Sequence, residues 1–441
     1  MVRRLTFLLV VLIATAVTSV PAWAQAPLSV ADAVSRARAR NPGARAAAAQ
    51  AREAEARVTQ ARAGYLPRVD VSESWQRGNQ PVFVFSSLLS QRRFEAADFA
   101  LDALNHPDAV GSFRAGVTIE QPLFNPAARA AVAAARAAGD IAALGETEAR
   151  RDLAVSVTSA YGRALLASAR AQAAGGAVAA ADADRARAAA RRDAGLVTDA
   201  DVLQLDMYLS RAKASQIEAH ADERIARAEL NALMGEPLDA EFALAPLAPL
   251  PSDASDLPAL ESEAIAARTE VQAAIQYERI AGAAQASARA AFLPQVSAHG
   301  GWELNGGDFQ SRASSWVAGV TARVNVFNGF ADRARLAEAR AQSARRAIER
   351  ERVETAVRLD VRTAAARVES ARARIDTARA ALAEAREARR IIRDRYENGL
   401  AGIADLLAAA RSEEEVATAR LSAEIDLAVA AASLHRALGR P

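Results

Sequence analysis

The sequence of 441 residues predicts a mainly α-helical protein in which two pairs of β-strands are set between long helices. Three observations predict this fold: a composition dominated by alanine, long stretches with small or apolar residues three and four positions apart, and short stretches in which that spacing changes to two. Only 5% of the residues are aromatic, although 51% are hydrophobic. Because alanine favours helices and lets them approach closely, a long helical assembly fits this composition better than a globular core does.

The first 24 residues have the pattern of a secretory signal peptide. A basic start containing Arg3 and Arg4 precedes the apolar run from Leu5 to Val17, and Ala22-Trp23-Ala24 has small residues at the cleavage positions. The apolar run is short for a bilayer span, and no later stretch offers the roughly 20 apolar residues of a membrane helix. We therefore expect residues 1–24 to be removed on export and the mature chain to have no helical membrane anchor.

The charge and cysteine content exclude several classes of function. The formal net charge of +2 is supplied by Arg3 and Arg4, so the chain without its signal has balanced charge and no electrostatic basis for binding nucleic acid. Without cysteine, the chain can form no disulfide, thiolate metal site or lipidated cysteine. Attachment to a membrane must therefore come from the fold.

Two copies of one unit make up the mature chain. Tyr65-Leu66-Pro67 recurs as Phe292-Leu293-Pro294, Leu123-Phe124-Asn125 recurs as Val326-Phe327-Asn328, and Leu230 with Gly235 recurs as Leu434 with Gly439. The first repeat spans residues 25–235 and the second spans residues 259–441. A proline-rich linker, residues 236–258, joins them, and we expect it to form a strap around the middle of the molecule rather than a long helix.

Each repeat is predicted to hold a short helix, a strand pair, a long helix, a tight turn and another short helix. In the first repeat the helices are expected over residues 29–63, 126–194 and 199–234, and in the second over residues 258–291, 330–398 and 403–438. Two short helices placed end to end match one long helix in each repeat. At about 1.5 Å per residue they would form a cylinder on the order of 100 Å long.

The strand pairs are expected within residues 66–123 and 293–327, where apolar and polar residues alternate. The apolar members are Val69, Val71, Trp75, Phe113, Ala115, Val117, Ile119, Val296, Ala298, Trp302, Leu304, Trp316, Ala318, Val320, Ala322, Val324 and Val326. A soluble hairpin with one wet face would show this pattern, but so would a transmembrane hairpin, and export favours the second interpretation. Four strands cannot close a barrel, so two or more copies must join, and three copies would supply twelve strands.

A pair of similar segments marks the two helix turns. Residues 191–203 (RRDAGLVTDADVL) and 395–407 (RYENGLAGIADLL) share an arginine, a glycine and an aspartate at the same spacing. With the strand pairs before them, these segments resemble the helix turns at the periplasmic tip of TolC-like outer membrane factors, the outer membrane efflux protein family. The candidate tip residues are Arg191, Gly195, Leu196, Asp201, Leu203, Arg395, Tyr396, Gly399, Leu400, Asp405 and Leu407.

The resemblance covers essentially the whole mature chain and implies a function. It implies a homotrimer with a 12-stranded barrel in the outer membrane lipid and a periplasmic α-barrel tunnel, acting as a passive export duct in tripartite efflux or type I secretion. A periplasmic adaptor protein and an inner membrane transporter would open the tip. By this resemblance Asp405 narrows the entrance, Asp201 takes a gate hydrogen-bonding position and Tyr396 matches a gate tyrosine. Ala401 and Ala408 stand where some members carry an arginine and an acidic residue, so the closing contacts are expected to differ.

No pattern of an enzyme, a cofactor site or a metal site stands out. The histidines His106, His220, His299 and His435 are scattered, without the spacing of a metal site. Residues 76–111 form an insertion rich in apolar residues, which either caps the extracellular mouth or packs against a neighbouring protomer. The alternative to the duct is a periplasmic coiled-coil adaptor or scaffold, which would lack barrel strands.

Overall fold

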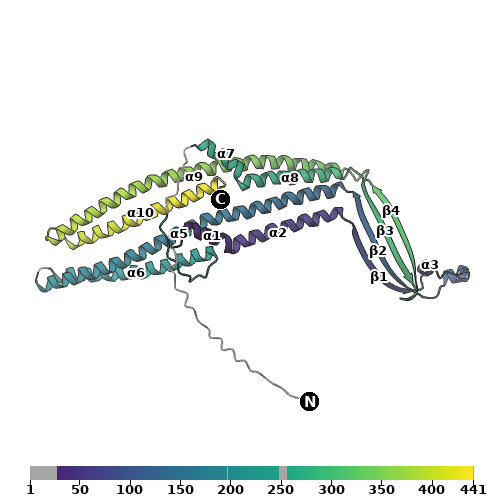
Figure 1. Cartoon of the computed structure of the whole chain (residues 1–441), viewed down its shortest axis with the longest axis horizontal. Coiled ribbons are helices and arrows are strands. Elements are labelled where there is room, and N and C mark those ends of the chain that lie inside the picture. Colours follow the sequence, from purple (N-terminus) through teal and green to yellow (C-terminus); the bar gives the residue numbers. More distant parts are fainter. Residues whose placement is uncertain (1–26, 196, 248–255, 441) are drawn as a thin grey trace, which may run out of the picture.

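The computed structural model describes residues 27–195, 197–247 and 256–440. Figure 1 shows an elongated molecule with a four-stranded sheet at one end, long helices along its length and two helix turns at the other end. In the first copy the elements are α1 (Val30–Arg40), α2 (Pro42–Arg62), β1 (Arg68–Gly78), β2 (Val110–Phe124), α5 (Pro126–Asp193) and α6 (Asp199–Met234). In the second they are α7 (Leu257–Ala267), α8 (Thr269–Ala290), β3 (Gln295–Gly306), β4 (Arg312–Arg323), α9 (Ala331–Glu397) and α10 (Ile403–Ala437).

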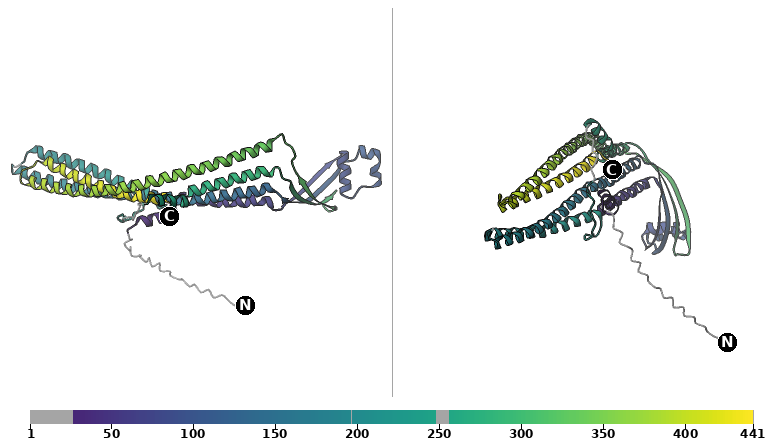
Figure 2. Two further views of the ribbon diagram at one scale, coloured as in Figure 1. Left: turned by 90° about the horizontal axis from the view of Figure 1, so that it is seen from above. Right: turned by 60° about the vertical axis from the view of Figure 1, so that its left-hand side comes forward.

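The helices are arranged differently in the two halves of the molecule. Toward the sheet, α2, α5, α8 and α9 lie side by side, as Figure 1 shows. Toward the turns, α5 pairs with α6 and α9 pairs with α10, so two antiparallel hairpins extend beyond the middle (Figure 2). The mixture of long antiparallel helices and four strands is the fold that the sequence predicts. No helix among the described residues combines the length and the apolar character needed to span a bilayer.

The helices predicted over residues 29–63 and 258–291 are each broken once, which corrects the expectation of one continuous helix. In the first copy the break lies at Asn41, whose ψ of 128° is extended because the following Pro42 disfavours helical geometry. The side chain of Asn41 then caps α2 by accepting hydrogen bonds from Gly43 N (2.8 Å) and Ala44 N (3.2 Å). In the second copy the break lies at Arg268, with ψ of 130°.

Two smaller boundaries also differ from the expectation. The strand expected to continue through Val324 and Val326 ends at Arg323, whose partner Gln295 follows Pro294, a residue without a backbone N–H to extend the ladder. The end of the linker predicted as residues 236–258 is helical, since α7 begins at Leu257 and proline is tolerated in a first helical turn. Residues 248–255 of the linker lie outside the described residues.

The sheet is antiparallel throughout, in the order β1-β2-β3-β4, and its register separates an apolar from a polar face. One row of directly paired residues is Val71, Val117, Trp302 and Trp316, and the next row on the opposite face is Ser72, Gly116, Glu303 and Ser315. The apolar face is uncovered: Val71 and Trp316 are each 78% exposed. The outer edges of β1 and β4 have no partner strand among the described residues.

The insertion between β1 and β2 is folded, and the β3–β4 connection has no counterpart to it. It contains α3 (Pro81–Ser90), a short 3₁₀ turn (Ala96–Phe99) and α4 (Leu101–Asn105). Arg92 donates a hydrogen bond to the carbonyl of Ser314 at 3.0 Å, and Gln91 donates one to the carbonyl of Gly111 at 3.0 Å. These bonds attach the insertion to the end of the sheet, beyond the strands in Figure 1. Its role at the mouth or against a neighbour stays a prediction.

Candidate functional site

The two predicted tip turns lie at the end of the molecule opposite the sheet (Figure 1). The first connects α5 to α6 and contains Gly195, with φ of +75°; the second connects α9 to α10 and contains Gly399, with φ of +74°. No atom within 4 Å would meet a side chain at either glycine, so the left-handed backbone is what makes glycine suitable there. Leu196, also predicted as a tip residue, lies outside the described residues.

The two aspartates of the tip begin the returning helices. Asp201 accepts hydrogen bonds from the backbone N of Thr198 (2.9 Å) and from its hydroxyl (2.8 Å), and the hydroxyl accepts one from Asp201 N. Those bonds hold the pKa of Asp201 below its ordinary value of 3.8. Asp405 accepts from Gly402 N at 3.1 Å, but glycine has no hydroxyl to complete a reciprocal box. Both carboxylates therefore have local bonds within one chain, and their gate roles stay predictions.

An apolar cluster, the tip cluster, joins the two turns. It consists of Ala188, Val202, Leu205, Ile403 and Leu406, with Ile392, Tyr396 and Leu407 packed at its edge. The guanidinium of Arg191 lies 5.9 Å from the ring centroid of Tyr396, within the range of a cation–π contact. The structure thus brings together Arg191, Tyr396 and Leu407 from the two predicted turns.

The other predicted tip residues point away from this cluster. Leu203 and Leu400 are 63% and 69% exposed, and Arg395 is exposed as well. Two apolar side chains left in solvent at the end of a molecule are available to a partner, because the chain itself does not cover them.

Behind the tip, a groove of about 900 Å³ separates the two hairpins. Arg187 and Arg191 of α5 line one side, and Arg389 of α9 and Glu413 of α10 line the other. Arg389 and Glu413 are joined by a 2.8 Å bond and were not singled out from the sequence. The sequence feature that could identify this pair is its position. The two residues lie at equal sequence distances before and after Ala401, and an antiparallel helical hairpin pairs such positions.

Neither the tip nor the rest of the described chain offers a metal centre. No three or more His, Cys, Asp or Glu side chains among the described residues are grouped so that they could hold a metal ion. At the tip, Thr198 and Asp201 form a helix cap, and Arg389 and Glu413 form an ion pair.

Comparison with known proteins assigns the chain to a family. The family model described as outer membrane efflux protein matches residues 33–236 and 260–440, which is most of both repeats. The chain belongs to the outer membrane efflux protein family. Protein CyaE of Bordetella pertussis is 30% identical to it over 395 residues, covering 87% of this chain and 78% of that protein.

Solved structures show the same fold. The CmeC outer membrane channel of Campylobacter jejuni superposes on this outer membrane efflux protein with a TM-score of 0.78 at 16% identity, covering 93% of this chain and 85% of that one. The MtrE outer membrane channel of Neisseria gonorrhoeae, in its open state, gives 0.75 at 21% identity, covering 93% and 89%. A membrane protein from Pseudomonas aeruginosa gives 0.77 at 23% identity, covering 93% and 90%. At these identities the likeness shows the fold, and the family to which the chain belongs supports a location in the outer membrane.

Proposed function

We propose that this chain is the outer membrane channel of a tripartite efflux or type I secretion system, working as a homotrimeric passive duct. The single observation that carries the proposal is the sheet, which has an exposed apolar face and two edges, β1 and β4, without a partner strand in the part of the chain that the structure describes. In lipid each unpaired backbone group is unfavourable by several kcal/mol, so the edges must pair between chains. Three copies supply twelve strands, enough for a closed barrel whose polar face lines the lumen.

The helices continue the duct into the periplasm. The 68 residues of α5 form one uninterrupted helix, which at about 1.5 Å per residue is on the order of 100 Å long. Three copies side by side would enclose a tunnel of that length. The predicted signal peptide, residues 1–24, supports export of the chain but lies outside the described residues.

The tip is the proposed contact with the partners. Leu203 and Leu400 are exposed apolar residues beside tight turns, a surface suited to the helical hairpin of a periplasmic adaptor. The inner membrane transporter would deliver cargo to the same end. Three Asp405 carboxylates brought together by trimer symmetry would attract cations at the entrance.

A charge placed on either face of the sheet tests the barrel. Val71→Arg introduces a cation on the apolar face, and the matched Ser72→Arg introduces the same cation on the polar face, one residue further along β1. If the apolar face meets lipid, the first variant is destabilised by about 2 kcal/mol per chain and the second by much less. The measurement is gel electrophoresis of the outer membrane fraction with and without boiling.

We expect the wild type and Ser72→Arg to give a boiling-sensitive trimer and Val71→Arg to lose most of it. A wild-type chain that fractionates as a soluble periplasmic monomer would overturn the duct and favour the coiled-coil scaffold. Equal tolerance of the two arginines in a membrane trimer would show that the apolar face does not meet lipid.

A further inference from the structure

The α9–α10 hairpin crosses the α5 helix at one close contact. Gly162 of α5 is buried against Ile425 of α10, and a methyl group at Gly162 would overlap Cγ2 of Ile425. Ile425 is itself buried. The missing side chain therefore lets the two helices approach closely at one place, which we name the crossing point.

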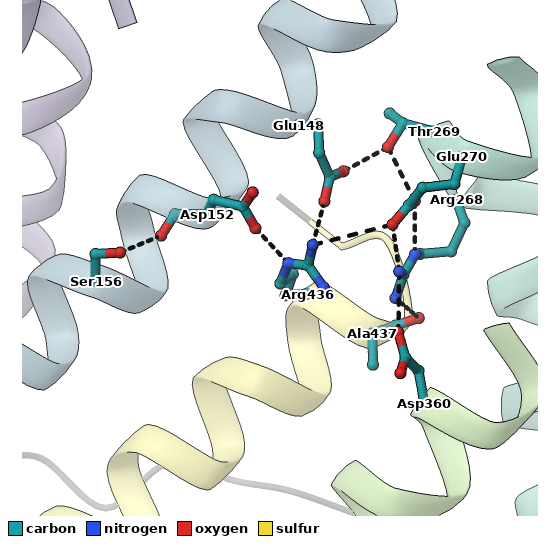
Figure 3. A network of polar contacts seen from close by, with 9 residues as sticks. All are labelled: Glu148, Asp152, Ser156, Arg268, Thr269, Glu270, Asp360, Arg436 and Ala437. Carbon is teal, nitrogen blue, oxygen red and sulfur yellow. Dashed lines mark hydrogen bonds and ion pairs between the residues drawn. The ribbon is translucent and has the colours of Figure 1, made fainter. Parts of the chain in front are cut away.

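The two hairpins also touch on both sides of the crossing point. Toward the tip they meet in the tip cluster, where Leu406 of α10 packs with residues of α5 and α6. Away from the tip, Arg436 near the end of α10 bonds to Glu148 of α5 at 2.8 Å and also to Asp152 (Figure 3). Between these contacts the hairpins are separated by grooves, among them the 900 Å³ groove described above.

This order of contacts makes α10 a lever on α5. Along α10, Ile425 lies between Leu406 and Arg436, and α10 is one continuous helix from Ile403 to Ala437. A continuous helix moves as a rod over this distance, so a rotation at the crossing point displaces both of its ends. Holding Arg436 in place therefore also holds the tip end of α10.

Arg436 is itself held by a larger network, which we name the ionic junction. It comprises Arg436 and Arg268 with Glu148, Asp152, Glu270, Asp360 and Thr269, drawn in Figure 3. Burial lowers the pKa of Arg436, but its bond to Asp152 and the charges of Asp152 and Glu148 outweigh burial and raise that pKa overall. Arg436 therefore remains a cation at any pH the cell experiences, and the contact does not depend on its titration.

The first copy shows that the repeat folds without this contact. The residue matching Arg436 in the duplicated sequence is Ala232 of α6, which can form no ion pair. Both α6 and α10 nevertheless end in the same way, at Gly235 and Gly439 with φ of +69° and +70°. The last helix of a repeat can thus end in this way without an arginine at that position. The contact of Arg436 with α5 therefore serves another purpose.

We propose that the contact of Arg436 with Asp152 and Glu148 is a latch that holds α10 against α5 and keeps the tip in the arrangement seen here. The inference rests on the proposed duct, because only a channel has a tip that must open. Releasing the latch lets α10 rotate about Gly162, separates the hairpins at the tip cluster and widens the entrance. Arg436 is a positioning residue: it touches no cargo and acts through the helix that carries it.

Single-channel recording of the full-length trimer in planar lipid bilayers tests the latch. Arg436→Gln removes the bonds to both acids, and we expect it to raise the occupancy of the high-conductance state about tenfold, equivalent to about 1.4 kcal/mol. Asp152→Asn leaves the bond to Glu148 and should raise the occupancy by less. The double variant should match Arg436→Gln alone, because that substitution already removes the contact with Asp152. Arg440→Gln is the matched control, since Arg440 pairs with Glu263 inside the second copy (2.7 Å) and does not reach α5.

The outcomes separate the latch from the duct. A wild type that forms no channel overturns the proposed function itself. A wild type that conducts, with Arg436→Gln and Asp152→Asn both unchanged, overturns the latch and leaves the duct standing. Additive effects in the double variant, or an equal effect of Arg440→Gln, would show that general loosening moves the tip. If Arg436→Gln fails to assemble, Asp152→Asn alone decides.

Discussion

In both copies the end of the last helix packs against the break between two shorter helices. Gly235 lies against the backbone of Arg40 just before the first break, and Gly439 lies against the backbone of Ala267 just before the second. Asn41 donates to the carbonyl of Leu233 at 2.9 Å, whereas its counterpart Arg268 donates to the carbonyl of Ala437 at 3.2 Å. We call each of these contacts between a helix end and a break a junction. The two junctions share the same backbone arrangement, although the residue at the break is Asn41 in the first and Arg268 in the second.

The side chains around the two junctions differ in chemistry. At the first, the hydroxyl of the fully buried Tyr161 lies 2.5 Å from the carbonyl of Leu28 and 2.7 Å from that of Ala245, next to a bridge between Leu28 and Leu244. At the second, the ionic junction surrounds Arg268, which is only 3% exposed. The first junction thus fixes the chain before α1 and the linker, while the second fixes the neighbouring repeat. Two junctions with the same backbone arrangement can therefore carry different side chains and hold different segments of the chain.

The largest expected effect is at Tyr161. Tyr161→Ala removes a fully buried ring and takes the hydroxyl donor away from the carbonyl of Ala245, so we expect a loss of about 3–5 kcal/mol in the free energy of unfolding. Tyr161→Phe keeps the ring and should lose about 1–3 kcal/mol. Urea unfolding of the detergent-solubilised protein measures both. A Tyr161→Ala value no larger than that of Tyr161→Phe would mean that packing at this junction contributes little.

The residues of these junctions show what the sequence could and could not predict. The strands, the long helices and the glycines follow from spacing and repetition, because each is a local pattern that occurs twice. The breaks at Asn41 and Arg268 were missed, since the helical spacing of small residues continues across a single extended residue. The ionic junction was also missed: 24% of the residues are charged, so nothing local says that Arg436 pairs with Asp152 rather than with another acid. At the tip, the turns were predictable, but the contact of Arg191 with Tyr396 depends on how two hairpins meet.

The next largest effect tests whether the two junctions share one backbone arrangement. An alanine at Gly235 or Gly439 would need a left-handed φ and would place its Cβ 2.8 Å from a backbone carbonyl oxygen. We expect each substitution to lower the free energy of unfolding by about 2–3 kcal/mol, to the same extent in the two copies. Gly195→Ala is the control, because it has the same φ but open space around it, and it should lose only about 1 kcal/mol. Thermal unfolding compares the three, and unequal losses at Gly235 and Gly439 would contradict a shared junction.

The smallest expected effect is the pH dependence of stability, which should differ between the two junctions. Burial raises the pKa of Tyr161 above its ordinary value of 10, so the stability that its neutral form contributes is present below pH 10 and is lost as the pH rises through the folded-state pKa. For Glu270, burial raises the pKa, but the hydrogen bond and charge of Arg268 and the charge of Arg436 outweigh burial and hold it below 4.5. Its contribution is present above pH 4.5 and is lost as the pH falls through the folded-state pKa. Raising the pH should therefore destabilise the first junction, and lowering the pH should destabilise the second.

Urea midpoints measured across pH distinguish these two losses. In Tyr161→Phe no phenol remains at this site, so the part of the alkaline decline that Tyr161 causes should disappear while the acid decline stays. In Glu270→Gln the acid decline should shrink and the alkaline decline should stay, although the variant starts from a lower midpoint because Arg268 has lost a charged partner. If both variants kept the wild-type profile, other carboxylates and phenols would dominate the titration. If each variant reduced both the acid and the alkaline decline of the urea midpoint, the two junctions would be coupled through α5. That helix carries Tyr161 and contributes Glu148 and Asp152 to the ionic junction.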